Sequence, residues 1–247
     1  MKKYFQNKSQ ILYYVISIIN KNNYPLIISG GNTIKDIFIN LDQKIRNIIL
    51  LSDERIVKKN SKLRNDIIFD KLIKKKLILR KNFISYKLSR INEKNLSELN
   101  KKINKFNFKI AILSLGSNGH FASIFKKQKE SHSYYFIQNA PKFPKTRVTI
   151  SLKKLKKCNK IIFLSSIKNK KKEIKNFNKN KLVKFLGFKK VRLLVYWIIM
   201  KRVLIIGGSG FLGSHIADIF TKKNYNVTIF DKIRSPWVKT KQKMIIS

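Results

Sequence analysis

Short apolar runs that end in glycine, serine or aspartate alternate along the chain with longer segments of helical periodicity. The apolar runs predict strands at residues 26–29, 47–51, 110–115, 147–151, 161–165 and 191–197. The periodic segments predict helices near residues 9–20, 33–41, 65–77, 95–104 and 168–176. This alternation is typical of βαβ units, so the sequence predicts an α/β fold with a Rossmann-like, mainly parallel sheet and helices on both faces.

The last part of the chain, from Met200 on, begins a second pattern of the same kind. Residues 202–206 predict a strand, residues 211–223 a helix and residues 227–230 a further strand, which together form one βαβ unit. Residues 232–247 are too few to complete a doubly wound domain. We therefore expect two parts, residues 1–199 and residues 200–247, of which the second is truncated.

The chain is strongly basic, with 56 lysines and arginines against 12 acidic residues among 247, a formal net charge of +44 at pH 7. Such a charge is typical of nucleic-acid-binding proteins. Here it is spread along the whole chain, and lysine, isoleucine and asparagine are abundant while alanine and glycine are scarce, as in products of A/T-rich genomes. Nucleic-acid binding is therefore an alternative that we do not favour.

The cysteine content and the length of the apolar segments indicate in which cellular compartment the protein is expected. The single cysteine, Cys158, excludes an internal disulfide and fits a reducing environment. The apolar run at residues 193–200 ends at Lys201, well short of the ~20 residues that a membrane-spanning helix needs. The sequence thus predicts a cytoplasmic protein that does not enter a membrane, with its oligomeric state left open.

The first predicted strand ends in a loop suited to binding an anion. Gly30, Gly31, Asn32 and Thr33 follow the strand and open a helix. Glycines let a ligand approach the backbone, and free N–H groups at a helix start favour an anion such as phosphate. A purely structural glycine turn, with Asn32 or Thr33 as the helix N-cap, is the alternative.

The next strand ends carry titratable side chains. Asp53, Glu54 and Arg55 follow the strand at residues 47–51, where a surface turn with a local ion pair is the alternative. His120 lies in a glycine-rich segment after the strand at residues 110–115. We expect it at the start of a helix, where the helix dipole keeps the imidazole neutral and able to accept a proton. A structural histidine is the alternative.

In this order, these segments resemble the glucosamine-6-phosphate isomerase/6-phosphogluconolactonase family over about residues 5–199. SGGNT (residues 29–33) is similar to the family's SGGST loop, SDER (52–55) to its DER segment, and LSLGSNGHFASIF (113–125) to its LGMGxDGHTASLF. Two further segments agree, because APKFPKTRVTISL (140–152) is similar to APKPPxxRITLT and FLSSIKNKKKEI (163–174) to FLVTGxxKxxxL. Five ordered motifs are far more specific than any one of them.

The lactonase branch of this family is the better match. The isomerase branch carries DEY and a GHIAFNEP continuation, whereas this chain has Arg55 and the residues ASIF at 122–125. The resemblance implies hydrolysis of 6-phospho-D-glucono-1,5-lactone, a small phosphorylated sugar lactone, to 6-phosphogluconate in the pentose phosphate pathway. It also implies that neither a metal nor an organic cofactor takes part.

The chemistry of lactone hydrolysis suggests catalytic roles for the matching residues. His120 is the candidate general base, because a neutral imidazole accepts a proton near neutral pH. Arg55 and backbone N–H groups of the glycine turns are candidate stabilisers of the oxyanion, and Asp53 is an orienting group rather than a nucleophile. Asn118 stands where the family has aspartate, so a charge beside His120 is lost, which predicts reduced activity.

A phosphate group is expected to lie against the loop of residues 30–33, with Arg147 and Lys170 as its cationic partners. Lys170 aligns with the family's lysine, and arginine suits bidentate contact while lysine acts as a point charge. Residues that depart from the family pattern in these segments are Ile34, Ser114 and Ile167. Ser114 and Ile167 replace glycines, so we expect them to crowd the backbone near the ligand.

The C-terminal part carries a dinucleotide-binding fingerprint. Gly207, Gly210 and Gly213 lie between a predicted strand and helix, and Asp231 ends the next strand. The segment resembles the opening of an NAD-dependent epimerase/dehydratase of the extended short-chain dehydrogenase family. The resemblance implies that the glycines line a pyrophosphate turn and that Asp231 binds the adenosine ribose.

The catalytic YxxxK pair of that family does not occur in residues 200–247, which excludes epimerase chemistry in this segment. We favour a truncated fusion of adjacent genes, in which the glycines and Asp231 are vestigial and NAD binding is not expected. An NAD-sensing appendage, and a βαβ unit that docks on the larger sheet, are the alternatives. An NAD(P)-binding protein of the epimerase type is accordingly the alternative function.

Overall fold

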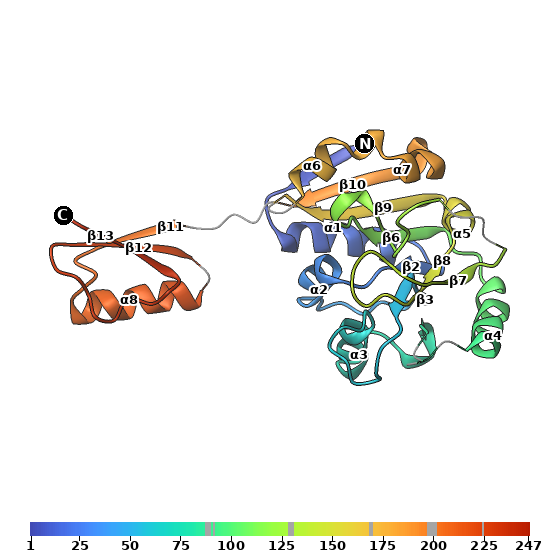
Figure 1. Ribbon diagram of the computed structural model, residues 1–247, viewed down its shortest axis with the longest axis horizontal. Helices are drawn as coiled ribbons and strands as arrows, with labels where there is room; N and C mark the ends of the chain where they lie inside the picture. The colour runs from blue at the N-terminus through green and yellow to red at the C-terminus, as the bar shows by residue number, and fades with distance from the viewer. Residues whose placement is uncertain (87–89, 91, 128–130, 168–169, 197–201, 224) are drawn as a thin grey trace. The chain divides into compact units, whose positions relative to one another are not determined.

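The computed structural model divides the chain into two compact units, Met1–Ile198 and Ile199–Ser247 (Figure 1). It describes residues 1–86, 90, 92–127, 131–167, 170–196, 202–223 and 225–247. The ends of two predicted elements, Lys168 and Trp197, and the predicted start of the second part, Met200, lie outside the described residues. Each unit is described by itself below.

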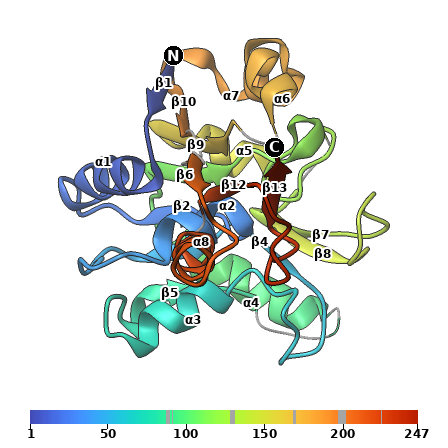
Figure 2. The same ribbon diagram turned by 90° about the vertical axis from the view of Figure 1, so that its left-hand side faces the viewer.

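The first unit is built on a seven-stranded sheet in which every neighbouring pair is parallel. In spatial order the strands are β1 (Lys2–Phe5), β10 (Val191–Tyr196), β9 (Lys160–Ser166), β6 (Ile110–Ser114), β2 (Leu26–Ile28), β3 (Ile49–Leu51) and β5 (Phe83–Ile84). Figure 2 shows α1 on one side of this sheet and β7 and β8 on the other. The predicted Rossmann-like parallel sheet is confirmed.

Helices cover both faces of the sheet. One hydrophobic core joins a face to α1 (Lys8–Asn20), α2 (Asn32–Phe38) and α3 (Ile67–Lys74). The other core joins the opposite face to α4 (Glu93–Asn104), α5 (Leu152–Lys156), α6 (Lys171–Lys175) and α7 (Lys181–Leu186). Single turns of 3₁₀ helix lie at η1 (Arg80–Asn82), η2 (Ser117–Gly119), η3 (Phe177–Lys179) and η4 (Phe188–Lys190). Because both faces are covered, the strands are continuously apolar rather than alternating.

A second, antiparallel sheet lies beside the carboxyl end of β3. It consists of β4 (Asp53–Arg55), β8 (Arg147–Ile150) and β7 (Tyr134–Ile137), with β8 in the middle. The predicted strand at residues 147–151 therefore exists, but it does not belong to the parallel sheet. The segment RVTI at residues 147–150 predicts a strand but does not show which partner the strand pairs with. The pairing sets Arg55 opposite Arg147.

The strand order reverses direction next to β2. From β2 the chain builds outward through β3 to β5, and it then returns to the other side of β2 to build β6, β9 and β10. In such sheets the loops after the two central strands diverge and leave a crevice that binds ligands. The two central strand ends are joined directly, because the Ser29 hydroxyl accepts a hydrogen bond from the Ser114 N–H at 2.8 Å.

The second unit is a three-stranded parallel sheet with one helix. It contains β11 (Arg202–Ile206), α8 (Phe211–Lys222), β12 (Asn226–Asp231) and β13 (Gln242–Ile246). The predicted βαβ unit is present, and β13 is a further strand that the sequence interpretation missed. A side chain at Gly213 would lie 2.5 Å from the carbonyl oxygen of Gly207, so glycine is required where the helix meets the turn.

Removal of the second unit tests whether the first folds alone. The hydrophobic clusters of the two units share no residue, so a chain ending at Ile198 should keep the unfolding midpoint of the first unit within experimental error. Chemical denaturation followed by far-ultraviolet circular dichroism measures this. Leu193→Ala, a cavity in the core of the first unit, is the positive control and should cost about 2–5 kcal/mol. A truncated chain that is as unstable as this control would contradict the prediction.

Candidate functional site

The carboxylate of Asp53 is held by three uncharged donors. Its Oδ1 accepts from the Ser52 hydroxyl at 2.7 Å, and its Oδ2 accepts from the Asn65 amide at 3.0 Å and the Ser123 hydroxyl at 2.7 Å. The side chain is buried at the first residue of β4. A carboxylate fixed from three sides is better placed to orient its neighbours than to attack a substrate, and the orienting role of Asp53 stays a prediction.

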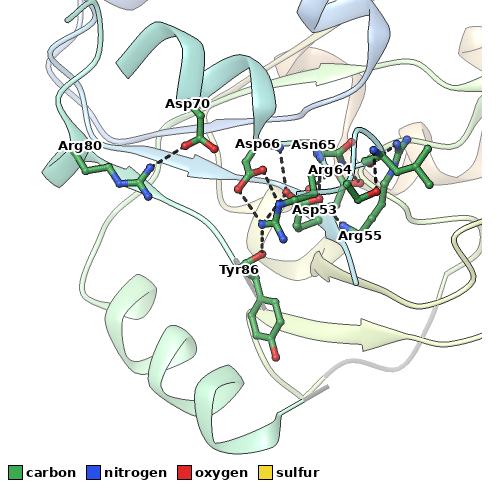
Figure 3. A network of polar contacts seen from close by, with 11 residues as sticks. Asp53, Arg55, Arg64, Asn65, Asp66, Asp70, Arg80 and Tyr86 are labelled. Atoms are coloured by element: carbon green, nitrogen blue, oxygen red, sulfur yellow. Dashed lines mark hydrogen bonds and ion pairs between the residues drawn. The ribbon is translucent and has the colours of Figure 1, made fainter. Parts of the chain in front are cut away.

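Glu54 is fully buried and organises the segment that contains Arg64, Asn65 and Asp66, which Figure 3 shows from close by. Its carboxyl oxygens accept backbone N–H groups from Arg55 at 2.6 Å, Asn65 at 2.8 Å and Asp66 at 3.0 Å. Burial raises the pKa of Glu54 to about 8, against these hydrogen bonds and the nearby Arg64 guanidinium, which lower it. The carboxyl group therefore accepts the hydrogen bonds of the backbone N–H groups of residues 65 and 66, which in a helix or sheet would go to carbonyl oxygens.

Arg64 is buried in the same network. Its Nε and Nη2 donate to the two carboxyl oxygens of Asp66 at 3.0 and 2.9 Å, a bidentate pair, and Nη2 lies 3.7 Å from Glu54 Oε2. The alternative reading of residues 53–55 as a surface turn with a local ion pair is wrong, because Asp53 and Glu54 are buried and Arg55 is half-buried. Their hydrogen-bond partners include residues 63, 65 and 66, eight to twelve residues downstream, a spacing that carries no sequence signal.

A small basic cavity lies between this network and the loop of residues 30–33. It measures about 70 Å³ and is lined by Gly31, Asn32, Lys35, Arg55, Lys62, Arg64, Asn65, Ile67 and Ile68. Arg55 donates to the carbonyl oxygen of Leu63 at 2.7 Å, and no described contact joins Arg55 to His120. Sequence reasoning missed the cations at positions 35, 62 and 64, because lysines and arginines are too common in this chain to stand out.

His120 lies after β6, in a turn and not at a helix start. The 3₁₀ turn of residues 117–119 precedes it and its own backbone is extended, so the expected helix dipole is absent from the described backbone around it. The imidazole is neutral for another reason: burial lowers the pKa of His120 below its usual value, against the Ser117 carbonyl and Asp53, which raise it. Desolvation disfavours the charged ring.

The imidazole of His120 has a defined orientation. Its Nδ1 lies 2.6 Å from the carbonyl oxygen of Ser117, its ring packs on Phe125 with centroids 4.6 Å apart, and a side chain at Gly116 would lie 2.5 Å from its Nε2. A carbonyl oxygen only accepts, so Nδ1 of the neutral ring carries the hydrogen and Nε2 is the free acceptor. This is the tautomer that a general base requires.

Asn118 does not contact the imidazole in the described part of the chain. It adopts a left-handed conformation with φ of 61°, which asparagine tolerates, and its N–H donates to Glu173 Oε1 at 3.0 Å. It lines a separate groove together with Gly119, Lys172, Glu173, Asn176, Lys179 and Asn180. The group that orients His120 is the backbone of Ser117.

Arg147 is buried at the start of β8, and its guanidinium is fixed by neutral acceptors. Nε donates to the Pro144 carbonyl at 3.0 Å, Nη2 to the Lys142 carbonyl at 2.9 Å and Nη1 to the Ser123 hydroxyl at 3.1 Å. The guanidinium also lies 5.5 Å from the ring centre of Phe125, the ring that packs on His120. The structure thus links Arg147 to Asp53 through Ser123 and to His120 through Phe125.

Lys170 contacts the segments that follow β2 and β6. Its Nζ donates to the Thr33 hydroxyl at 3.3 Å and to the Leu115 carbonyl oxygen, and burial lowers the pKa of this lysine. The loop of residues 30–33 does open α2, but Gly31, at φ 85°, is the N-cap residue in place of Asn32 or Thr33. Lys170 and this loop lie together, as the sequence predicted.

The remaining candidate groups are less suited to catalysis. Burial raises the pKa of Cys158 to about 12, so its thiol is not a nucleophile near neutral pH. Within the described ranges no group of three or more His, Cys, Asp or Glu residues could hold a metal ion. A search of those same residues finds no helix that is both long and apolar enough to cross a membrane.

The glycine turn of the second unit is closed by its own aspartate. Asp231 Oδ2 accepts the Ser209 N–H at 2.8 Å, and Oδ1 accepts the Lys232 N–H at 2.7 Å. Gly207 adopts a φ of 70°, and the helix begins after Gly210. The turn thus has the shape of a pyrophosphate loop, but the carboxylate expected to bind a ribose is engaged by backbone N–H groups.

Fold and site together define a doubly wound α/β protein with a neutral histidine after β6, a buried arginine at the start of β8 and a lysine after β9. The sequence model of the glucosamine-6-phosphate isomerases/6-phosphogluconolactonase family matches residues 9–184. The chain belongs to this family.

Individual relatives agree with that assignment. The 6-phosphogluconolactonase of Borreliella burgdorferi is 31% identical over 178 residues, which cover 64% of this chain and 75% of that protein. Among solved structures, the 6-phosphogluconolactonase of Thermotoga maritima superposes with a TM-score of 0.67 at 19% identity, covering 80% of this chain and 99% of that one. The Trypanosoma brucei 6-phosphogluconolactonase gives 0.64 at 19% identity, covering 79% and 95%. At these identities the solved structures show a shared fold.

Glu54→Gln tests the role of the buried carboxyl group. The glutamine amide nitrogen would replace the oxygen that accepts the Asp66 N–H, which leaves a buried donor unpaired and should lower the free energy of unfolding by about 1–3 kcal/mol. Urea denaturation measures this. Asp70→Asn removes an exposed ion pair with Arg80 and is the matched control, with an expected loss of at most about 1 kcal/mol.

The same variant has a pH signature. The pKa of Glu54 rises from 4.5 to about 8 on folding, so the folded state binds the extra proton and stability falls as pH rises through that interval. Glu54→Gln lacks this titration, so the stability difference between the native chain and the variant should shrink from pH 4.5 to pH 8. A difference that stays constant over this interval would contradict the assignment.

Proposed function

We propose that this chain is a 6-phosphogluconolactonase that hydrolyses 6-phospho-D-glucono-1,5-lactone to 6-phosphogluconate. Family membership and the similarity to the Borreliella burgdorferi 6-phosphogluconolactonase support the proposal. The observation that carries it is a desolvated, neutral His120 whose Nε2 is free to accept a proton at the switch point of the sheet. The reaction proposed needs neither a metal nor an organic cofactor.

In the proposed reaction His120 acts first as base and then as acid. Nε2 takes a proton from water while the water oxygen adds to the lactone carbonyl carbon, and negative charge develops on the carbonyl oxygen. The bond between the carbonyl carbon and the ring oxygen then breaks, and the imidazolium returns its proton to the ring oxygen.

Phosphate binding is assigned to cations on both sides of the loop of residues 30–33. Lys170 contacts Thr33 of this loop, and Arg55 lines the basic cavity on its other side, so we assign Arg55 to the anion rather than to the oxyanion. Arg147 approaches from β8 as a rigid guanidinium. A substrate carrying a dianionic phosphate would thus meet several positive charges before its lactone reaches His120.

For the second unit we propose no catalytic role and no binding of NAD. Asp231 is engaged by the Ser209 N–H, which favours a purely structural use of the carboxylate. That residues 200–247 are a truncated fusion of adjacent genes, rather than an NAD-sensing appendage, stays a prediction.

His120→Ala should abolish lactone hydrolysis above the spontaneous rate while the affinity for 6-phosphogluconate changes by less than a few fold. Loss of general base catalysis typically costs about 10²–10⁴-fold in rate. Spectrophotometric assay with freshly generated lactone and calorimetric titration with 6-phosphogluconate measure the two effects. His215→Ala, in the second unit, is the matched control and should leave both unchanged. Equal losses of rate and affinity would make His120 a structural residue.

The native enzyme should lose kcat on acidification with an apparent pKa below 6.5. Burial lowers the pKa of His120, and only the neutral imidazole acts as base, so activity is retained until the pH falls below the usual histidine range. An inflection above 6.5 would contradict this assignment.

Arg147→Ala and Lys170→Ala should each weaken 6-phosphogluconate binding by about tenfold, as expected for a charge-assisted hydrogen bond. The loss should diminish at high ionic strength if the attraction is mainly Coulombic. Lys171→Ala, an exposed neighbour, is the matched control for Lys170 and should bind like the native chain. Unchanged binding in both site variants would exclude this placement of the phosphate.

A further inference from the structure

The Ser123 hydroxyl lies between the Arg147 guanidinium and the Asp53 carboxylate. It is the acceptor of Arg147 Nη1 at 3.1 Å and the donor to Asp53 Oδ2 at 2.7 Å, and the residue is 3% exposed. The direction of both hydrogen bonds is fixed by chemistry, because a guanidinium only donates and a carboxylate only accepts. The result is a polarised chain from guanidinium through hydroxyl to carboxylate.

The Ser123 hydroxyl is presented by a tight turn whose backbone is strained. Ala122 and Ser123 adopt φ of 47° and 54°, and the Ile124 N–H donates to the Phe121 carbonyl at 2.7 Å, as in a tight turn of type I′. Such turns favour glycine and asparagine, and a left-handed conformation is costly for alanine and serine. The Thr149 hydroxyl anchors the turn by donating to the Ala122 carbonyl.

Arg147 is left with a defined set of free donors. Three of its five N–H groups are directed to Pro144, Lys142 and Ser123 within the described part of the chain, which leaves one N–H on each terminal nitrogen. Two N–H groups on adjacent nitrogens form the fork that contacts phosphate oxygens. A direct ion pair with Asp53 would consume this fork, and the interposed hydroxyl prevents that pairing.

We propose that Ser123 is a positioning residue that holds the Arg147 guanidinium open for an anionic ligand by insulating it from Asp53. The consequence for ligand binding rests on the proposed function, in which Arg147 contacts the phosphate. The bridge itself rests on the two hydrogen bonds and on the strained turn that presents the hydroxyl between two oppositely charged, buried groups.

The test compares Ser123→Gly with Ala122→Gly in the full chain. Glycine accepts a positive φ, so both variants relieve the same turn, and only Ser123→Gly loses the hydroxyl. Ser123→Gly should weaken 6-phosphogluconate binding about three- to tenfold and raise KM with a smaller change in kcat, whereas Ala122→Gly should bind and turn over like the native enzyme. Native affinity in Ser123→Gly, or an equal loss in both glycine variants, would overturn the proposal.

A double-mutant cycle identifies the residue through which Ser123 acts. In the Arg147→Ala background, Ser123→Gly should cause no further loss of affinity, because its effect is exerted through the missing guanidinium. Additive losses would overturn the proposal.

The urea midpoint of unfolding is also measured for the native chain, the two single variants and the double variant. This measurement requires no enzymatic activity. Non-additive midpoint shifts for the two substitutions support the bridge, and additive shifts overturn it. If the native chain fails to hydrolyse the lactone, the proposed function fails while the midpoint cycle still decides whether the bridge exists.

Discussion

The burial of three carboxyl groups side by side is the constraint on which the site depends. Asp53, Glu54 and Asp66 are all buried, in a chain with only 12 acidic residues and 56 basic ones. A buried carboxyl group is costly unless hydrogen bonds or charges surround it. Here backbone N–H groups of residues 55, 65 and 66, uncharged side chains and Arg64 satisfy that requirement, and in doing so they fix the path of the chain from β4 to α3.

Much of this arrangement could be predicted from the sequence, and the reason is topological. The carboxyl ends of parallel strands gather at one edge of the sheet, so Gly30, Asp53 and His120 could be assigned to one crevice from strand ends alone. Family motifs placed Arg147 and Lys170 there as well. What the sequence could not reveal is the set of partners that come from irregular segments, above all Asn65 and Ser123, because no period or spacing relates them to the residues that they contact.

The errors have a common physical origin. The glycine-rich segment before His120 suggested a helix start, but the chain forms a 3₁₀ turn followed by a tight reversal, and burial rather than a dipole keeps the ring neutral. The strand at β8 was correctly expected, but its antiparallel pairing with β4 and β7 was not predicted. In both cases local composition predicted the type of element, while tertiary contacts decided its partners and its end.

Because the whole chain is strongly basic, the way in which buried arginines are paired affects where an anion binds. The positive charge is spread along the whole chain, so a net charge of +44 attracts anions to the whole protein without selecting one place. Selection requires that some guanidinium groups be held rigidly, desolvated and partly unpaired. Direct pairing with Asp66 holds Arg64 through Nε and Nη2, whereas a neutral hydroxyl between Arg147 and Asp53 holds the Arg147 guanidinium and leaves one N–H on each of its terminal nitrogens. The site therefore differs from the rest of this basic protein in how rigidly its positive charges are held, and not in how many there are.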